Sequence, residues 1–326
     1  MNNKFKLLLS VTFIIPLVAC SSVKHYSLED YELNMEFNNN NSFKIMQLTD
    51  IHLGVQVDNV KEMKFIRSFI EENKPDLIVI TGDTFLDANK SIVKFFFDKM
   101  DEIKIPYAFT YGNHDLQGTY NSEFIHKTIS KAKYAMYKDY PDDDLFGRTN
   151  YYINLNKRNN TLYRLYIIDS NSYSYQGTKY SYDVIHEDQL EHISKINAKN
   201  PCFGLSFFHI PLIEYQETYD RYVKGEVKGK GENREPSCPG YANNDVLKKL
   251  YNSNIRASFV GHDHINYSDV VYDGFSDDFI LSYGVKANKT IYGNDDIMGC
   301  KIITLDSENV GISLDNIEAK FYDYSI

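Results

Sequence analysis

Apolar segments that each run into a polar cluster recur along this chain from residue 43 onward. These segments are rich in Ile, Val, Leu and Phe and cover residues 43–48, 77–80, 105–110, 162–168, 202–208 and 257–260. Segments with helical spacing lie between the early ones, and within 60–70 the apolar residues at 60, 63, 66, 69 and 70 share one helix face. The alternation of strands with helices predicts an α/β domain whose strands are largely parallel.

Beyond residue 260 the pattern changes to short strand-like segments, at 269–271, 279–282, 300–305 and 310–314. We assign 43–326 to a single domain because neither an internal repeat nor a second linker interrupts this part of the sequence. Residues 215–240 are charged, rich in Gly and poor in apolar spacing, which predicts a long loop, either functional or a surface excursion. Residues 20–42 are polar and predict a tether.

The N-terminus has the pattern of an export signal. Lys4 and Lys6 precede an apolar run at 7–19, which is shorter than the ~20 residues that span a bilayer. The run ends in Leu-Val-Ala-Cys at 17–20, which resembles the bacterial lipobox. We therefore expect residues 1–19 to be a signal peptide and a lipid on Cys20 to anchor the protein to a membrane outside the cytoplasm. A secreted protein in which Cys20 is incidental is the alternative.

Composition and charge restrict the functions that the chain can have. Its 326 residues include 27 Tyr and 20 Phe, which are too many aromatic residues for a disordered protein. The net charge of −10 becomes −12 when residues 1–19, which hold two lysines and no acids, are removed. General nucleic-acid binding is therefore not expected. Cys202, Cys238 and Cys300 are too few for a disulfide scaffold, although one bridge among them stays open.

The chemistry-bearing residues follow five of the apolar segments. In chain order these clusters are Asp50-Ile51-His52, Gly82-Asp83, Gly112-Asn113-His114-Asp115, His209 and Gly261-His262-Asp263-His264. Taken singly, each cluster is better explained as a helix cap, a turn or a core histidine. Together they hold five of the nine histidines, each cluster after its own strand. Ligands in open α/β sheets bind beyond the carboxyl ends of strands, so we expect one common site.

The ordered series resembles the calcineurin-like metallophosphoesterase superfamily, whose pattern is D-x-H, G-D, G-N-H-D/E, a strand-terminal H and G-H-x-H. The resemblance covers residues 43–265 and implies an α/β fold of the two-sheet αββα sandwich type. The stretch FHIPLIEY at 208–215 further resembles yeast and plant proteins related to purple acid phosphatases. The purple enzymes carry a ligand tyrosine three residues after the Asp of G-D, where this chain has Leu86. The resemblance therefore implies a centre without the purple colour.

The resemblance also implies two metal ions and the residues that hold them. One ion would be bound by Asp50, His52 and His264, the other by Asn113, His209 and His262, with Asp83 bridging the two. Imidazole and oxygen ligands without thiolate suit divalent Mn, Fe, Zn or Co, and their identity stays open. A carboxylate can bridge two ions ~3.5–4 Å apart, which is the separation used on phosphate esters.

The expected function is hydrolysis of a phosphate-ester substrate by attack of metal-bound hydroxide, and we expect a phosphomonoesterase. His114 is not a ligand in the family pattern, so we assign it as the proton donor to the leaving group, with Asp115 as its orienting partner. One alternative is a phosphodiesterase for a cyclic nucleotide, a nucleic-acid end or a phospholipid headgroup. Another is a surface binding protein that has lost turnover, although every motif position is filled.

Several further residues are weaker candidates. Asp169 ends a predicted strand and is a candidate partner for a metal ligand. The predicted long loop offers candidate phosphate contacts in Arg234 or in Lys224, Lys228 and Lys230, although a solvated surface role is favoured for each. Asp263, between two expected ligand histidines, is expected to have a structural role in a turn. His25, His126, His186 and His192 have polar neighbours and are expected at the surface.

Overall fold

The computed structural model of the chain describes residues 26–139, 145–242, 245–289, 293 and 296–324. The predicted signal peptide and Cys20 lie outside these residues. Among the residues described, we find no helix of sufficient length and apolar character to span a bilayer.

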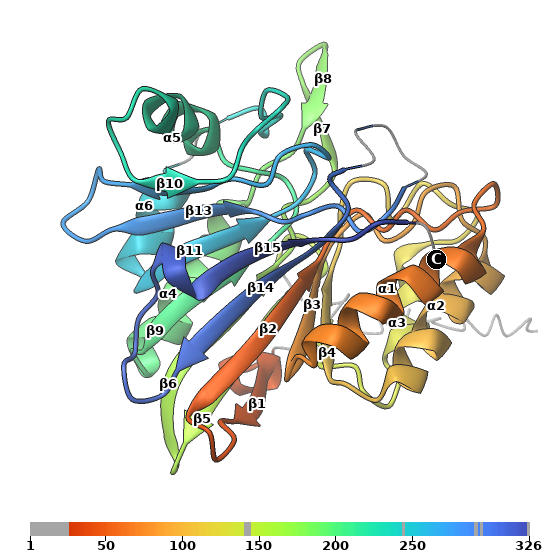
Figure 1. The fold of residues 1–326 in the computed structure, drawn as a ribbon, viewed down its shortest axis with the longest axis horizontal. Helices are drawn as coiled ribbons and strands as arrows, with labels where there is room; N and C mark the ends of the chain where they lie inside the picture. The colour runs from red at the N-terminus through yellow and green to blue at the C-terminus, as the bar shows by residue number, and fades with distance from the viewer. Residues whose placement is uncertain (1–25, 140–144, 243–244, 290–292, 294–295, 325–326) are drawn as a thin grey trace, which may run out of the picture.

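Two β-sheets form the centre of the molecule (Figure 1). Within the described residues, the larger sheet has eight strands in the spatial order β1 (Glu32–Glu36), β5 (Asn150–Lys157), β6 (Asn160–Ile168), β9 (Phe203–Phe207), β11 (Ile255–Val260), β13 (Phe279–Tyr283), β12 (Asp269–Tyr272) and β10 (Gly229–Lys230). The smaller sheet is ordered β15 (Ile317–Phe321), β14 (Gly299–Asp306), β2 (Ser42–Leu48), β3 (Leu77–Thr81) and β4 (Tyr107–Thr110). A separate hairpin consists of β7 (Tyr173–Gln176) and β8 (Lys179–Tyr182).

Each sheet contains a block of parallel strands. In the smaller sheet β2, β3 and β4 are parallel, and in the larger sheet β6, β9, β11 and β13 are parallel. The pairs β5–β6, β10–β12, β12–β13, β2–β14 and β14–β15 are antiparallel, so both sheets are mixed and only part of each matches the expected parallel arrangement. Because parallel strands direct their carboxyl ends to one edge, the polar clusters that follow them are brought together there.

Helices cover the outer faces of the two sheets, which gives the expected αββα sandwich (Figure 1). On the side of the smaller sheet lie α1 (Asn59–Asn73), α2 (Lys90–Ile103) and α3 (Ser122–Ile129). On the side of the larger sheet lie α4 (Glu187–Lys199), α5 (Glu214–Val223) and α6 (Val246–Asn252). The short 3₁₀ segments are η1 (Leu28–Tyr31) and η2 (Leu314–Asn316).

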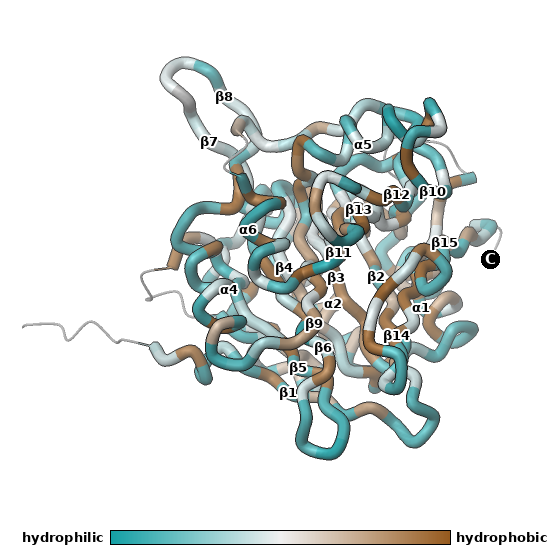
Figure 2. The backbone as a smooth tube through the Cα atoms, turned by 90° about the vertical axis from the view of Figure 1, so that its left-hand side faces the viewer, coloured by the Kyte–Doolittle hydropathy of each residue, from teal (hydrophilic) through white to brown (hydrophobic). Residues whose placement is uncertain are grey.

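The sequence of β3 shows why its strand is apolar throughout. Leu77 and Val79 pack into the layer between the sheets, whereas Ile78 and Ile80 face the layer under the helices. Successive residues of a strand point to opposite faces, so a strand buried on both faces needs a continuous apolar run. Each such side chain contributes about 1.5–3 kcal/mol relative to an exposed position. Figure 2 shows the apolar residues concentrated in the central strands.

The helix α2 illustrates how the outer layer is attached. Asn89 caps its N-terminus by accepting hydrogen bonds from the backbone N–H of Ser91 (2.9 Å) and Ile92 (3.1 Å). Phe96 and Met100 are spaced four residues apart and are buried against the smaller sheet. The amphipathic pattern therefore both forms the helix and directs it onto the sheet.

Three sequence-based assignments need correction. The predicted tether at 20–42 contains folded structure, because β1 pairs in parallel with β5. The predicted loop at 215–240 begins with the helix α5, whose inner face is made by Tyr215 and Thr218 rather than by aliphatic residues. The predicted strand at 310–314 is irregular, and the edge strand β15 follows it.

The structure also answers whether the three cysteines of the described residues form a disulfide. Cys202, Cys238 and Cys300 are all free there, and Cys300 is buried in β14. The structure therefore contains no disulfide among these three.

Candidate metal centre

Loops from both sheets meet at one edge of the sandwich and bring the expected ligands together. Asp50 and His52 follow β2, Asp83 follows β3, Asn113 follows β4, His209 follows β9, and His262 and His264 follow β11. Each of the seven side chains is at most 7% exposed. Seven buried polar side chains from five loops therefore form one site at this edge.

The backbone at this edge is strained in a way that the sequence did not reveal. Asp50, His52, Asp83 and His262 all have positive φ angles, of 53°, 49°, 50° and 80°. For residues other than glycine such a conformation costs on the order of 1–3 kcal/mol and concentrates at functional sites. Backbone hydrogen bonds hold it in place, since the Asp50 N–H donates to the carbonyl of Gly82 (3.2 Å). The strain directs the side chains into one small volume.

Two motif glycines allow the loops to approach each other. Gly82 has a φ of 87°, and a Cβ placed on it would lie 2.7 Å from the Cα of Gly112. A Cβ on Gly112 would collide with the backbone nitrogen of Asp83. A side chain at either position would therefore push Asp83 away from Asn113.

The first group of ligands is formed by Asp50, His52, His264 and Asp83. The Nε2 atoms of His52 and His264 lie 3.7 and 3.5 Å from Oδ1 of Asp50. The Nε2 of His52 also lies 3.7 Å from Oδ2 of Asp83. The candidate ligand atoms of these four residues all lie within 4.8 Å of one another.

The second group is formed by Asp83, His209, His262 and Asn113. The Nε2 of His209 lies 3.1 Å from Oδ2 of Asp83 and 3.2 Å from Oδ1 of Asn113. The other ring nitrogen of His209 donates to the carbonyl of Thr81 (2.8 Å), which leaves Nε2 as the atom able to bind a metal. The rings of His209 and His262 are 5.1 Å apart.

Both groups fit a divalent metal ion. Ligand atoms about 2.1 Å from one tetrahedral cation lie about 3.4 Å apart, which matches the nitrogen–oxygen distances of the first group better than hydrogen bonding does. Among the described residues, Oδ1 of Asp50 and both ring nitrogens of His52 are buried without a hydrogen-bond partner. Oδ2 of Asp83 faces both groups, while its Oδ1 accepts the backbone N–H of His114 (2.8 Å). The two groups of ligands therefore share one carboxylate oxygen, Oδ2 of Asp83.

Burial and the neighbouring charges shift the pKa values of several ligand side chains. Burial would raise the pKa of Asp50, but the adjacent imidazoles of His264 and His52 outweigh it and hold that pKa well below its usual range. Burial would lower the pKa of His209, but the adjacent Asp83 carboxylate raises it to about 10. Burial and the charge of His209 lower the pKa of His262 to about 3. A metal ion bound at Nε2 of His209 requires that nitrogen to be unprotonated.

The structure changes the partner expected for His114. Its Nδ1 lies 2.6 Å from Oε1 of Gln117, whereas the carboxylate of Asp115 accepts the backbone N–H groups of Gly112 (2.7 Å) and Phe85 (3.0 Å). Asp115 is completely buried and joins the loops after β3 and β4. The structure thus shows Gln117, not the expected Asp115, in contact with the ring of His114, and Asp115 bound to the loop backbone.

The weaker candidates have local structural contacts. Asp169 accepts the backbone N–H groups of Arg148 and Asn171, both at 2.8 Å. Asp263 accepts the hydroxyl of Tyr283 (2.7 Å), in agreement with the structural role expected of it. Arg234 pairs with Glu232 and Asp296 at the surface and not with the metal centre.

Two tyrosines that sequence analysis did not select contact the ligands. The Nδ2 of Asn113 donates to the hydroxyl of Tyr173 (3.1 Å), and the ring of Tyr182 lies 4.4 Å from that of His262 in an edge-to-face arrangement. Both belong to the hairpin of β7 and β8. Its signal in the sequence is the alternation of tyrosines at 173, 175, 180 and 182 around Gly177.

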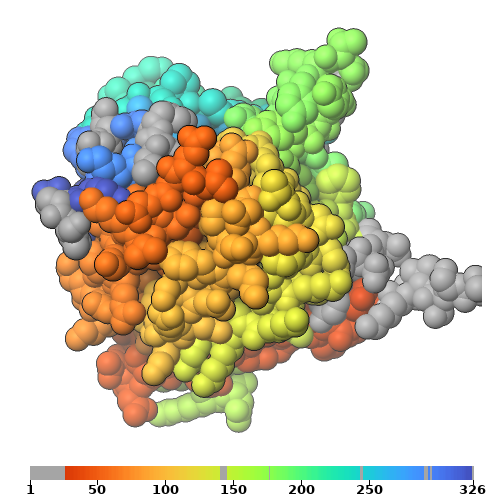
Figure 3. Space-filling view, turned by 90° about the vertical axis from the view of Figure 1, so that its right-hand side faces the viewer, coloured from red at the N-terminus to blue at the C-terminus, as the bar shows by residue number. Residues whose placement is uncertain are grey.

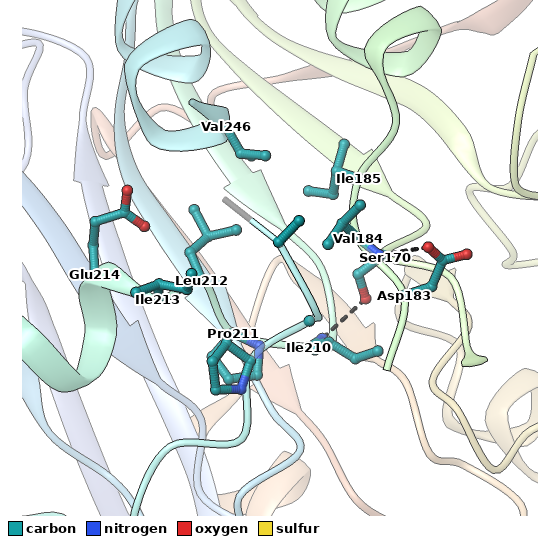
Figure 4. A pocket seen from close by; sticks show the side chains of 13 residues that line it. Ser170, Asp183, Val184, Ile185, Ile210, Pro211, Leu212, Ile213, Glu214 and Val246 are labelled. Carbon is teal, nitrogen blue, oxygen red and sulfur yellow. Dashed lines mark hydrogen bonds between the residues drawn. The ribbon is translucent and has the colours of Figure 1, made fainter. Parts of the chain in front are cut away.

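A small cavity lies behind the loop that carries His209 (Figure 4). Its volume is about 20 Å³, and Val184 and Leu212 contribute to its apolar lining. Ser170 at its wall accepts the backbone N–H of Ile210 (2.9 Å). A space of this size holds about one water molecule and is too small for an organic ligand.

Comparison with known proteins agrees with this geometry. Residues 43–266 match the family model of the calcineurin-like phosphoesterases. A dimetal phosphatase from Danio rerio has a similar fold, with a TM-score of 0.52 over 80% of this chain and 95% of that chain, at 12% identity. This likeness confirms the expected fold class.

Two curated relatives illustrate the range of the similarity. Phosphatase DCR2 of Saccharomyces cerevisiae is 31% identical over 274 residues, which cover 74% of this chain and 47% of the yeast protein. The chain thus spans about half the length of that relative. A protein of Arabidopsis thaliana named "Probable inactive purple acid phosphatase 28" is 27% identical over 281 residues, which cover 72% of this chain and 68% of the plant protein.

Proposed function

Because the chain belongs to the calcineurin-like phosphoesterase family, we propose that it is a binuclear metal-dependent hydrolase of phosphate esters, and specifically a phosphomonoesterase. The observation that carries the proposal is the shared Oδ2 of Asp83, which lies 3.1 Å from Nε2 of His209 and 3.7 Å from Nε2 of His52. A single metal site would not need a carboxylate between two groups of ligands. The name of the yeast relative supports a phosphatase rather than another phosphoesterase.

The residues of this chain have distinct tasks in that reaction. Two divalent cations held by these residues would supply the Lewis acidity that activates water and neutralises phosphoryl oxygens. Asp83 holds both groups of ligands together, and Thr81 fixes the ring of His209 through its carbonyl. Gln117 accepts a hydrogen bond from Nδ1 of His114, which leaves Nε2 to give a proton to the leaving oxygen when the ring is cationic.

The role of His114 can be separated from metal binding. We expect His114→Ala to lower kcat for an alkyl phosphate by about 10²- to 10⁴-fold, the range for loss of a general acid, while metal content stays at the wild-type value. The measurement is steady-state kinetics together with metal analysis of the same preparation. An ester with an acidic leaving group, such as 4-nitrophenyl phosphate, needs protonation less and should be affected less. Equal losses for both esters would exclude the proton-donor role.

The main rival is a binding protein without turnover, as the word "inactive" in the name of the plant relative suggests for that protein. Against it stands the complete set of ligands, since an inactive protein has no need to keep seven buried ligand residues together, four of them with a strained backbone. Metal-reconstituted protein should hydrolyse 4-nitrophenyl phosphate. If the protein retains two metal ions but hydrolyses no phosphate ester in a broad substrate panel, the rival is correct.

The second rival is a phosphodiesterase. The same assay with bis(4-nitrophenyl) phosphate tests it, because the two substrates share the leaving group and differ only in the second ester. We expect the monoester to be preferred. A clear preference for the diester would replace the phosphomonoesterase proposal and leave the metal centre unaffected.

We further propose export and lipid anchoring through Cys20, based on the apolar run at 7–19 and the lipobox-like sequence. The mass of the mature protein tests this directly, since a lipidated N-terminus at residue 20 adds acyl chains to the peptide mass. A mature protein that starts elsewhere without a lipid would support the secreted alternative.

A further inference from the structure

The hairpin of β7 and β8 projects from the sandwich beside the metal centre (Figures 1 and 3). Its strands pair Tyr173 with Tyr182 and Tyr175 with Tyr180. Because side chains alternate between the faces of a strand, all four tyrosines lie on one face, while Ser181 lies on the other. The hairpin therefore has one aromatic face and one polar face.

The four tyrosine rings form a continuous column. Tyr182 stacks on Tyr173 with ring centres 5.2 Å apart, and Tyr173 stacks on Tyr180 at 4.9 Å. Tyr175 lies 4.8 Å from Tyr180 at the outer end. Tyr175 and Tyr180 are 71% and 54% exposed, which is unusual for large aromatic side chains. The column thus ends in rings that the described residues cover only in part.

The inner end of the column touches two of the expected metal ligands. Tyr173 accepts a hydrogen bond from Asn113, and Tyr182 packs edge-to-face on His262. The base of the hairpin is also fixed to the loop, since Ser172 donates from its hydroxyl to the carbonyl of Asn113 (3.1 Å). The aromatic face therefore begins directly beside the metal centre, within reach of a molecule bound there.

We propose that the outer rings, Tyr180 and Tyr175, stack on a flat aromatic ring that the leaving group of the substrate carries at a distance from the ester oxygen, as the base of a nucleoside monophosphate does. This proposal rests on the phosphomonoesterase function above. A ring attached directly to the ester oxygen, as in a phenolic phosphate, would reach only the inner rings, Tyr182 and Tyr173. The exposure of the outer rings favours the longer leaving group.

A protein partner fits this surface less well. A stable protein interface buries about 800 Å² on each side, and one face of two four-residue strands falls short of that area. Stacking of a base on an aromatic side chain, by contrast, needs only one or two free ring faces. The column offers these at its outer end.

The test compares adenosine 5′-monophosphate with ribose 5-phosphate, which has the same ester and sugar but lacks the base. For the wild-type protein we expect kcat/KM to favour the nucleotide. In Tyr180→Leu that preference should fall about five- to hundredfold, the range for one lost base-stacking contact. Tyr180→Phe keeps a flat ring and should restore the preference. Ser181→Ala, on the opposite face of the same strand, is the matched control and should keep it.

Binding measurements give a readout that does not depend on turnover. Adenosine, which has no phosphate, should bind to the wild-type protein by calorimetry and lose affinity in Tyr180→Leu but not in Tyr180→Phe. Equal kcat/KM values for nucleotide and sugar phosphate would overturn this proposal while leaving the phosphomonoesterase function intact. No hydrolysis of any phosphate ester would refute that function, and the proposal would fall with it. A wild-type dimer that becomes a monomer in Tyr180→Leu would assign the column to a contact between copies instead.

Discussion

Two groups of buried charged side chains in this molecule differ in how their polar atoms are satisfied. Between the sheets, Lys301 of β14 donates to Asp269 of β12 (2.7 Å) and to the carbonyl of Tyr267 (3.0 Å), and Asp269 also accepts from Ser282 (2.6 Å). At the metal centre, several buried atoms of Asp50 and His52 have no hydrogen-bond partner within the described part of the chain. The first group is complete with protein alone, whereas the second needs an external ligand.

The difference matters because an unsatisfied buried polar atom costs about 1–3 kcal/mol. A protein that tolerates several of them together, with backbone strain in addition, must recover the cost in its functional form. The Lys301–Asp269 pair requires no such explanation, since it connects the two sheets and satisfies its own atoms. The combination of clustered unsatisfied atoms and backbone strain thus distinguishes the metal centre from a structural ion pair of similar burial.

The largest expected effect is that of Asp83→Asn. The amide keeps the size of the side chain but removes the negative charge that both groups of ligands share, so both metal ions should be lost together and activity should fall to background. Metal analysis of the purified variant measures this. Retention of one ion per chain would contradict the shared oxygen and reduce the centre to two independent sites.

Asp269→Asn should lower the stability of the fold and leave metal binding unchanged, the reverse of what is expected for Asp83→Asn. The substitution leaves Lys301 buried without its carboxylate partner, which costs about 3–5 kcal/mol of folding free energy. Two metal ions should still be bound, because Asp269 does not contact the ligands. Denaturant unfolding and metal analysis of the same variant give both values. Loss of metal without loss of stability would show that the two groups are not independent.

A smaller effect is expected at the hydrogen bond between Tyr173 and Asn113. Tyr173→Phe removes only the hydroxyl that orients the Asn113 amide, and a lost contact of this kind lowers metal affinity by about 10- to 100-fold. Competition with a chelator measures the affinity. Tyr175→Phe, which removes the hydroxyl of an exposed ring in the same hairpin, is the control. If the two variants bind metal equally well, the hydroxyl of Tyr173 does not orient the ligand.

The smallest effect concerns pH. Burial lowers the pKa of Lys301 despite the attraction of Asp269, so the unfolded chain binds a proton more readily than the folded one. Stability should therefore rise with pH from the lowered pKa of Lys301 toward the ordinary lysine value of about 10.4. The measurement is the free energy of unfolding as a function of pH. Subtracting the curve of a Lys301→Met, Asp269→Leu double variant from that of the wild type isolates the contribution of Lys301. A difference curve that falls with pH in that window would contradict the assigned direction.

Much of the architecture could be predicted from the sequence because local pattern and burial agree. The strands β2, β3 and β9 lie within one residue of their predicted bounds, since a continuous apolar run flanked by glycine or polar residues has few alternatives. The helix α5 was missed because tyrosines rather than aliphatic residues make its inner face. The strand β1 was missed because its ELNME sequence has no apolar run, and only its partner β5 makes it a strand.

For the site, the sequence by itself determined which residues gather at one edge, because each motif directly follows a strand of a mostly parallel core. Only the tertiary structure decided how they act on one another. That Gln117 rather than Asp115 contacts the ring of His114, and that one oxygen of Asp83 serves both groups, depends on side-chain directions. That Tyr173 reaches Asn113 depends on a contact between residues 60 positions apart. Contacts between residues so far apart in the sequence form when the two sheets pack face to face, and no local sequence pattern encodes them.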